Sequence, residues 1–273
     1  MTKLDQSGPV RRSRIDLDPT TNETITRELV GDERALYYYG ENVGLLTFQM
    51  WFPSITLPGH QADMRTYDFP VRLKFVPEPF DAAPFHESSE ERRGWNVPAW
   101  QRAALELQEQ GVRAIVGGCG LTGNIQSAIQ SVLEIPFYSS TMMFVPELFR
   151  AMPDGKKLAV LTVGEGFLRG HNEALFRECG IDPNWPIVYQ GMYESDQVEK
   201  WLVMDNIHFD PALVEESMVT VASQMMDEHP DIGQFVFECT SMPPFTEAVR
   251  RATGVRVFDP VDMVKRVNAM VDS

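Results

Sequence analysis

Two segments of the sequence, centred on Cys119 and Cys239, repeat one pattern. In each, a short apolar run ends one or two positions before the cysteine, and a segment of helix length follows. A second apolar run then places Phe137 and Val257 each 18 residues after its cysteine, and the similar runs VGLLTFQ and KLAVLTV open the two halves. Strands that alternate with helices predict parallel sheets, so we expect an α/β fold of two related lobes, each with a mostly parallel sheet.

The predicted domain boundaries follow changes of composition along the chain. Residues 1–40 are polar and form an N-terminal arm with a short helix near Thr24–Leu29; the arm is either flexible or wraps around a neighbouring subunit. Lobe 1 spans 41–150 and is rejoined by the C-terminal segment 256–273, whereas lobe 2 spans 151–255. The arm and several Met-rich apolar segments lead us to expect a homo-oligomer.

Charge and composition exclude several classes of partner. The 273 residues carry a formal charge of −15, whereas nucleic acids and anionic membranes select a basic face, so we expect neither partner. No apolar run is long enough for a bilayer span, and no charged-then-apolar leader follows Met1. Three cysteines are too few for a disulfide framework, which favours a reducing compartment, and the simplest location is the cytoplasm.

The position of the repeated cysteines has a chemical meaning. Each falls where a strand is predicted to end and a helix to begin, and open α/β sheets bind ligands at the carboxyl ends of their strands. A helix N-terminus binds anions and lowers the pKa of a cysteine, which suits a thiolate base. If the lobes face each other about a pseudo-twofold axis, Cys119 and Cys239 meet across one cleft. The third cysteine, Cys179, is predicted to be a small buried hydrophobe.

A carboxylate substrate would have to be held without a cation nearby in sequence. Residues 114–149 and 231–249 contain no Lys, Arg or His. We therefore expect backbone amides to bind the carboxylate, because consecutive N–H groups form anion-binding nests. The candidate substrate-binding residues come from both cysteine segments: Gly120, Leu121, Thr122, Thr240 and Ser241. The hydroxyls of Thr122, Thr240 and Ser241 either add hydrogen bonds to the substrate or cap the helices that follow.

At these residues the sequence resembles the aspartate/glutamate/hydantoin racemase superfamily. The motifs that carry the resemblance are GGCGLTGN around Cys119, ECTSMPPF around Cys239 and LTVGE at 161–165. Within the superfamily, the chain looks most like the Alma-type dimethylsulfoniopropionate lyases and their bacterial relatives, through ECT-x-x-PP-aromatic followed by Ala-Thr-Gly at 252–254 and Val-Phe-Asp at 257–259. The similarity covers roughly residues 43–265.

The resemblance implies two Rossmann-like lobes with an active site in the cleft between them. It also implies a small carboxylate or zwitterionic substrate, and no pyridoxal phosphate, metal or nucleotide. One cysteine would remove the proton α to the carboxylate; in a racemase the other returns a proton to the opposite face, whereas in a lyase loss of a β-leaving group replaces that return. Thr162, at the end of the strand that opens lobe 2, is a further substrate-binding candidate by resemblance.

One motif departs from the family pattern. Residues 118–120 read Gly-Cys-Gly, where amino-acid racemases usually have Cys-Asn-Thr, which puts an ammonium partner on this loop in question. The leading prediction is a cofactor-independent racemase- or isomerase-type enzyme, with Cys119 and Cys239 as its acid/base pair. The alternative is a dimethylsulfoniopropionate lyase that uses the same cysteines. A catalytically idle binding protein and a cysteine hydrolase stay open, although no His or Asp stands in a recognisable triad context.

Two further groups of residues have both a structural and a functional interpretation. His60 and Asp63 lie in a loop without metal-ligand spacing, so we expect solvated polar side chains there and no metal site. Trp51 and Phe52 follow the first predicted strand, and core packing is expected for them. The alternative is a wall of the substrate pocket with a cation–π contact to a sulfonium or ammonium group.

Overall fold

The computed structural model describes residues 12–17, 24–29, 41–49, 57–79, 95–164, 173–192 and 210–272. The chain forms two compact units, Met1–Tyr39 and Gly40–Ser273. In the first unit, β1 (Arg12–Leu17) and β2 (Thr24–Leu29) form an antiparallel pair. The helix predicted near Thr24–Leu29 is therefore wrong. The segment begins with three β-branched residues in a row, which favour an extended chain.

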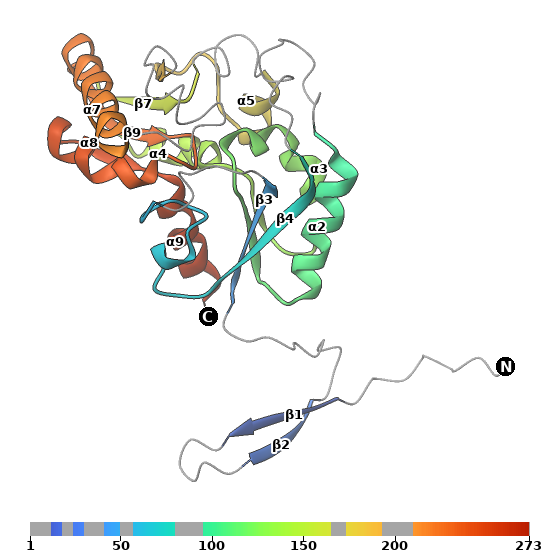
Figure 1. Ribbon diagram of the computed structural model, residues 1–273. Helices are drawn as coiled ribbons and strands as arrows, with labels where there is room; N and C mark the ends of the chain where they lie inside the picture. The colour runs from blue at the N-terminus through green and yellow to red at the C-terminus, as the bar shows by residue number, and fades with distance from the viewer. Residues whose placement is uncertain are drawn as a thin grey trace. The chain divides into compact units, whose positions relative to one another are not determined.

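The second unit contains two sheets, each of four parallel strands (Figure 1). The first sheet has the order β4-β3-β5-β6. Its strands are β3 (Val43–Gln49), β4 (Val71–Pro79), β5 (Ala114–Gly117) and β6 (Phe137–Tyr138). VGLLTFQ and the apolar run before Cys119 thus lie side by side at the centre of one sheet.

The second sheet repeats the order of the first. Its strands are β7 (Lys157–Thr162), β8 (Val188–Gly191), β9 (Ile232–Phe237) and β10 (Arg256–Phe258). Read from the edge at β8, the order is β8-β7-β9-β10, and every neighbouring pair is parallel. Each strand of the first sheet thus has a counterpart four strands later in the chain. This arrangement confirms the predicted α/β fold with two related parallel sheets.

Helices connect the strands. In the described part of the chain, the α-helices are α2 (Val97–Glu109), α3 (Gln126–Gln130), α4 (Val145–Arg150), α5 (Glu173–Cys179), α7 (Pro211–Glu228), α8 (Thr246–Thr253) and α9 (Pro260–Val271). Four 3-10 helices are also described: η2 (Met64–Thr66), η3 (Gly120–Ile125), η4 (Thr141–Phe144) and η6 (Pro243–Phe245). None of the described helices is long and apolar enough to cross a membrane.

Both faces of the second sheet are covered. Successive residues of a strand point to opposite faces of its sheet, so neighbouring residues enter different cores. Phe235 and Phe237 of β9 pack in one core with Val214 and Met218 of α7, whereas Val236 between them belongs to the other core. All five side chains are buried, and burying a phenylalanine side chain contributes about 1.5–3 kcal/mol. The carboxyl end of β9 is thus fixed from both sides.

The C-terminal segment crosses from the second sheet to the first core. Strand β10 pairs with β9, and α9 then packs with Val261, Val264 and Val267 in the core that also contains β3 and β5. Asp259 begins α9 with a capping box, because its Oδ1 accepts hydrogen bonds of 2.8 Å from the N–H groups of Val261 and Asp262. The division into lobes 41–150 with 256–273 and 151–255 stays a prediction.

Candidate active site

Cys119 and Cys239 occupy equivalent places in the two sheets. Each lies two residues after the end of its strand, β5 or β9, and a 3-10 helix follows: η3 begins at the residue after Cys119, and η6 begins four residues after Cys239. The charge of Cys239 contributes to raising the pKa of Cys119, so the two thiols are close enough to interact. The fold therefore brings the two repeated cysteines to one site at the carboxyl ends of parallel strands.

The hydrogen-bond donors nearest the thiols come from the turns that follow them. The N–H of Thr122 donates to the main-chain oxygen of Cys119 at 3.0 Å. Hydrogen bonding by the N–H groups of Leu121 and Thr122 lowers the pKa of the Cys119 thiol, and hydrogen bonding by the N–H and the hydroxyl of Ser241 lowers that of Cys239. The long helix predicted after Cys119 is instead a 3-10 turn followed by a five-residue α-helix. This turn contains two glycines and an asparagine, which are weak formers of α-helix.

The pKa values of both thiols are raised, whereas a position at a helix start predicted a lower pKa. The pKa of Cys119 lies well above its ordinary value and that of Cys239 is raised to about 12. Burial of the thiol is the largest cause in each case, and the negative charge of Glu238 is the second. The residues are half-buried as a whole, but desolvation at the sulfur outweighs the donated hydrogen bonds.

Glu238 is the site residue that the sequence analysis missed. It is buried at the end of β9, and its Oε2 accepts a hydrogen bond of 2.9 Å from the hydroxyl of Thr162 on β7. Burial raises the pKa of this carboxyl to about 7. The signal was present in the sequence, because Glu238 is the single charged residue in the apolar run before Cys239. A charged residue in such a run needs a partner or a function.

The substrate-binding candidates have different surroundings. Thr240 donates to the main-chain oxygen of Gly118 at 3.2 Å, which joins the two cysteine turns. The hydroxyl of Thr162 already donates its hydrogen bond to the carboxyl of Glu238. Thr122 is fully buried, and its hydroxyl has no hydrogen-bond partner among the described residues. An unpaired buried hydroxyl is costly, so Thr122 is the strongest of these candidates for a contact with a bound molecule.

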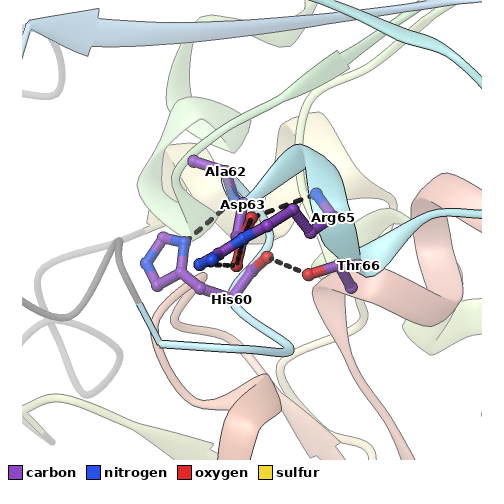
Figure 2. Close-up of polar contacts among 5 residues, drawn as sticks. All are labelled: His60, Ala62, Asp63, Arg65 and Thr66. Atoms are coloured by element: carbon purple, nitrogen blue, oxygen red, sulfur yellow. Dashed lines mark hydrogen bonds and ion pairs between the residues drawn. The ribbon is translucent and has the colours of Figure 1, made fainter.

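A loop between β3 and β4 also contacts both cysteine turns. Within it, Nε2 of His60 lies 3.1 Å from Oγ of Ser241, and the side-chain amide of the adjacent Gln61 donates to the main-chain oxygen of Gly117 at 3.2 Å. The expectation that His60 and Asp63 are solvated is wrong, because both are less than a tenth exposed. Figure 2 shows His60 with its ring beside the main chain of Ala62. Ser241, one of the two partners of the ring, lies on a distant segment, so the sequence around His60 gave no sign of its burial.

The other predicted residues lie in the first core or outside the described residues. Cys179 is buried in the first core, where burial raises its pKa well above the ordinary value. Trp51 and Phe52 fall outside the described residues. Among the described residues, no group of three or more His, Cys, Asp and Glu side chains is arranged to hold a metal ion.

The sequence and the fold were compared with known proteins. The sequence model of the Asp/Glu/Hydantoin racemase family matches residues 75–266, which include both cysteine turns. A dimethylsulfoniopropionate lyase from Durusdinium sp. clade D is 27% identical over 208 residues, which are 75% of this chain and 67% of the relative. Dimethylsulfoniopropionate lyase 3 from Emiliania huxleyi is 33% identical over 159 residues, 57% of this chain and 41% of the relative. The chain thus spans only part of the length of these relatives.

Solved structures share the fold at low sequence identity. An aspartate racemase homologue from Pyrococcus horikoshii superposes with a TM-score of 0.55 at 16% identity, over 85% of this chain and all of that chain. Allantoin racemase from Pseudomonas fluorescens gives the same TM-score at 15% identity, over 84% of this chain and 90% of that chain. The sequence match and the paired sheets lead to one conclusion: this chain belongs to the Asp/Glu/Hydantoin racemase family.

Proposed function

We propose that the chain is a carbon–sulfur lyase that eliminates dimethyl sulfide from a small carboxylate bearing a β-sulfonium group. The proposal reverses the order of the two sequence-based alternatives, for two reasons. The curated relatives with similar sequences are dimethylsulfoniopropionate lyases. The charges at the thiols also favour a substrate that carries a positive charge.

The electrostatics of the thiol pair is the observation that carries the proposal. The groups that act on the pKa of Cys119 and Cys239 in the described part of the chain are Glu238, the other thiol and hydrogen-bond donors; none is Lys or Arg. A dicarboxylate would add negative charge and make a thiolate harder to form. A sulfonium group would compensate the thiolate and the Glu238 carboxylate. Binding of a zwitterion thus lowers the pKa of the base that must act on it.

In the proposed reaction Cys239 is the base. Its thiolate is stabilised by two donors from Ser241, one of them a hydroxyl, whereas Cys119 receives main-chain N–H groups alone. The thiolate takes a proton from Cα, and the electron pair of that C–H bond forms the Cα=Cβ double bond. The Cβ–S bond breaks, dimethyl sulfide leaves with its electron pair, and acrylate remains. The new S–H proton passes to water before the next cycle.

The remaining groups bind the carboxylate in this proposal. Burial and the charge of Glu238 raise the pKa of Cys119, and in this proposal its protonated thiol is a hydrogen-bond donor. The unpartnered hydroxyl of Thr122 is a second donor, placed at the same turn. As the family resemblance implies, the reaction uses no cofactor.

Racemisation is the second candidate, because the two cysteines stand at equivalent places in related halves. Opposed thiols are the geometry needed to remove a proton from one face of a carbon and return it to the other. A racemase requires each thiol to act as base in one direction. The difference between the donors around Cys119 and Cys239 makes this candidate the weaker one.

One experiment separates the candidates. The full chain and its C119A, C239A and C179A variants are incubated in deuterated water with dimethylsulfoniopropionate, and separately with single enantiomers of amino acids. We expect the parent and C179A to release equal amounts of dimethyl sulfide and acrylate, and C119A and C239A to be at least about a hundredfold slower. Cys179 is the matched control because it is buried in the first core.

Three outcomes would overturn the proposal. Loss of optical activity with deuterium uptake, and no release of sulfide, would favour racemisation. Release of sulfide that persists in both C119A and C239A would remove the cysteines from the mechanism. Binding of dimethylsulfoniopropionate by calorimetry without any turnover would favour a binding protein.

A further inference from the structure

We propose that His60 is a positioning residue for the Cys239 thiolate, and that it acts through the hydroxyl of Ser241. The inference deepens the proposed function, on which it rests in one respect: Cys239 is taken as the base. His60 lies on the loop between β3 and β4, 181 residues from Ser241 in sequence. The two side chains meet only because the fold brings the two halves together.

The hydrogen bonds of His60 show which of its two ring nitrogens carries the proton. The main-chain N–H of Ala62 donates to Nδ1 of His60 at 2.9 Å, so Nδ1 is an acceptor and carries no proton. A neutral imidazole then carries its proton on Nε2, and this group lies 3.1 Å from Oγ of Ser241. His60 therefore donates to Ser241, and Ser241 donates in turn to the sulfur of Cys239.

The ring of His60 is held neutral across the range in which a thiolate base works. Burial lowers its pKa to about 4, and the nearby Asp63 carboxylate only partly opposes this effect. The titratable groups that interact electrostatically with Cys239 are the carboxyl of Glu238 and the thiol of Cys119. A neutral ring with a fixed tautomer has a single N–H, and that N–H is directed at the serine.

The loop holds the imidazole by its main chain as well as by its ring. The hydroxyl of Thr66 and the N–H of Asp63 both donate to the main-chain oxygen of His60, at 3.0 and 3.1 Å; Figure 2 shows the Thr66 contact. Gly59, with φ of +93°, places the preceding turn so near the second half that a Cβ there would lie 3.3 Å from Cα of Pro244. These contacts restrict the movement of His60 relative to Ser241.

The role of the hydroxyl follows from its geometry. A serine hydroxyl rotates freely about its Cβ–Oγ bond and can direct its proton to several acceptors. Once Oγ accepts a hydrogen bond from His60, the remaining directions for the proton are fewer, and Cys239 is one of them. His60 thus orders a donor that stabilises the thiolate, without touching the thiolate itself.

The test measures thiolate formation directly and needs no substrate. The folded chain is alkylated with iodoacetamide at about pH 8.5, where the rate follows the thiolate fraction. Trypsin then places the three cysteines on separate peptides, 114–150, 178–200 and 201–250, so that mass spectrometry gives the rate for each. Circular dichroism establishes that each variant is folded.

Two substitutions of His60 separate the ring proton from the volume of the ring. The side-chain amide introduced by H60Q reaches the position of Nε2, whereas the shorter amide introduced by H60N reaches only the position of Nδ1. We expect H60N to slow the alkylation of Cys239 about tenfold, because the Ser241 hydroxyl is no longer held in its charge-assisted hydrogen bond to the thiolate, and H60Q to recover most of the rate. S131A is the control: it removes an exposed side-chain hydrogen bond to the main-chain oxygen of Ala128 at the end of α3 and leaves the loop of His60 unchanged, so the rate should stay within about twofold.

A double-variant cycle shows whether the effect passes through Ser241. S241A should slow Cys239 as H60N does, and H60N/S241A should be no slower than S241A alone. Equal rates in H60N and the parent, or effects that multiply in the double variant, would overturn the proposal. The alkylation result is independent of lyase activity: a chain that releases no sulfide but shows this pattern refutes the proposed function alone, and an active chain without the pattern refutes the role of His60 alone.

Discussion

Gly120 lies against Glu238, which comes from the other half of the repeat. A Cβ atom on Gly120 would be 1.9 Å from Oε1 of Glu238 and 2.4 Å from its main-chain oxygen. Neither distance is tolerable between unbonded atoms. The contact between the residue after one of the paired cysteines and the residue before the other therefore requires a glycine.

We predict that G120A is destabilised by about 1–3 kcal/mol or more, because the added methyl group must displace both the carboxyl and the strand end of Glu238. Activity should fall with it. Urea unfolding of the parent and the variant measures the change in free energy of unfolding. Replacing Glu238 by Ala in the G120A background should recover only part of the loss, because the main-chain oxygen remains.

G155A is the control for this prediction. Gly155 favours glycine for a different reason, its φ of +77°, and an added Cβ there would have no neighbour within 4 Å. Its cost should be about 1 kcal/mol, from the backbone alone. Equal losses in G155A and G120A would contradict the predicted clash.

Glu238 should make stability depend on pH. Its pKa is raised from 4.5 to about 7 in the folded state, so between these values the folded chain binds a proton that the unfolded chain has lost. Stability therefore falls as pH rises through this window, by about 3 kcal/mol in total, and levels off above about pH 7. E238Q should lose this dependence and become more stable than the parent at higher pH.

Unfolding curves at several pH values between about 4 and 8 test this prediction. Asp259, whose pKa is raised to about 6, adds a slope of the same sign, but it is present in both proteins and cancels in the difference. E247Q, on the exposed face of α8, is the control and should follow the parent. A constant difference between E238Q and the parent at all pH values would contradict the assignment.

Thr162 should be needed to keep Glu238 in place. T162V preserves the shape of the side chain but removes the hydrogen bond to Oε2 at the end of β9, which leaves the buried carboxyl with one partner fewer. We expect a loss of about 1–3 kcal/mol and a fall in stability that continues to higher pH than in the parent, because the Thr162 hydroxyl stabilises the ionised form. T162S, which retains the hydroxyl, should restore the pH range of the parent. A parent-like pH range in T162V would contradict this role.

The capping box of α9 should contribute to the stability of the first core. Asp259 accepts two N–H groups at the start of α9 and a hydrogen bond of 2.6 Å from the Thr246 hydroxyl. D259A should cost about 0.5–2 kcal/mol, measured by thermal unfolding, with dimethyl sulfide release little changed below the transition. D259N, which keeps an acceptor for the N–H groups, should cost less than D259A.

The arrangement of strands was largely predictable because its signals are local. A run such as VGLLTFQ can bury its side chains only as a strand in a covered sheet, and the equal spacing of Phe137 and Val257 from their cysteines reflects equal crossover lengths. The segment Thr24–Leu29 was mispredicted because a short polar segment carries little signal, and its pairing partner decides its conformation.

The proximity of the two cysteines was predictable, whereas the groups that surround them were not. Cys119 and Cys239 repeat in sequence, whereas His60 meets Ser241 across 181 residues. The pKa values were mispredicted because a helix start is visible in a sequence, but the desolvation that outweighs it depends on the packing of distant segments.

The two halves differ at the residue directly before each cysteine. Gly118 precedes Cys119, and Glu238 precedes Cys239, each one residue after the end of its strand, β5 or β9. Because Glu238 also lies against Gly120, its single carboxyl raises the pKa of both thiols. The two sheets thus have the same strand order, whereas the ionisable group that acts on both cysteines comes from the second half of the repeat.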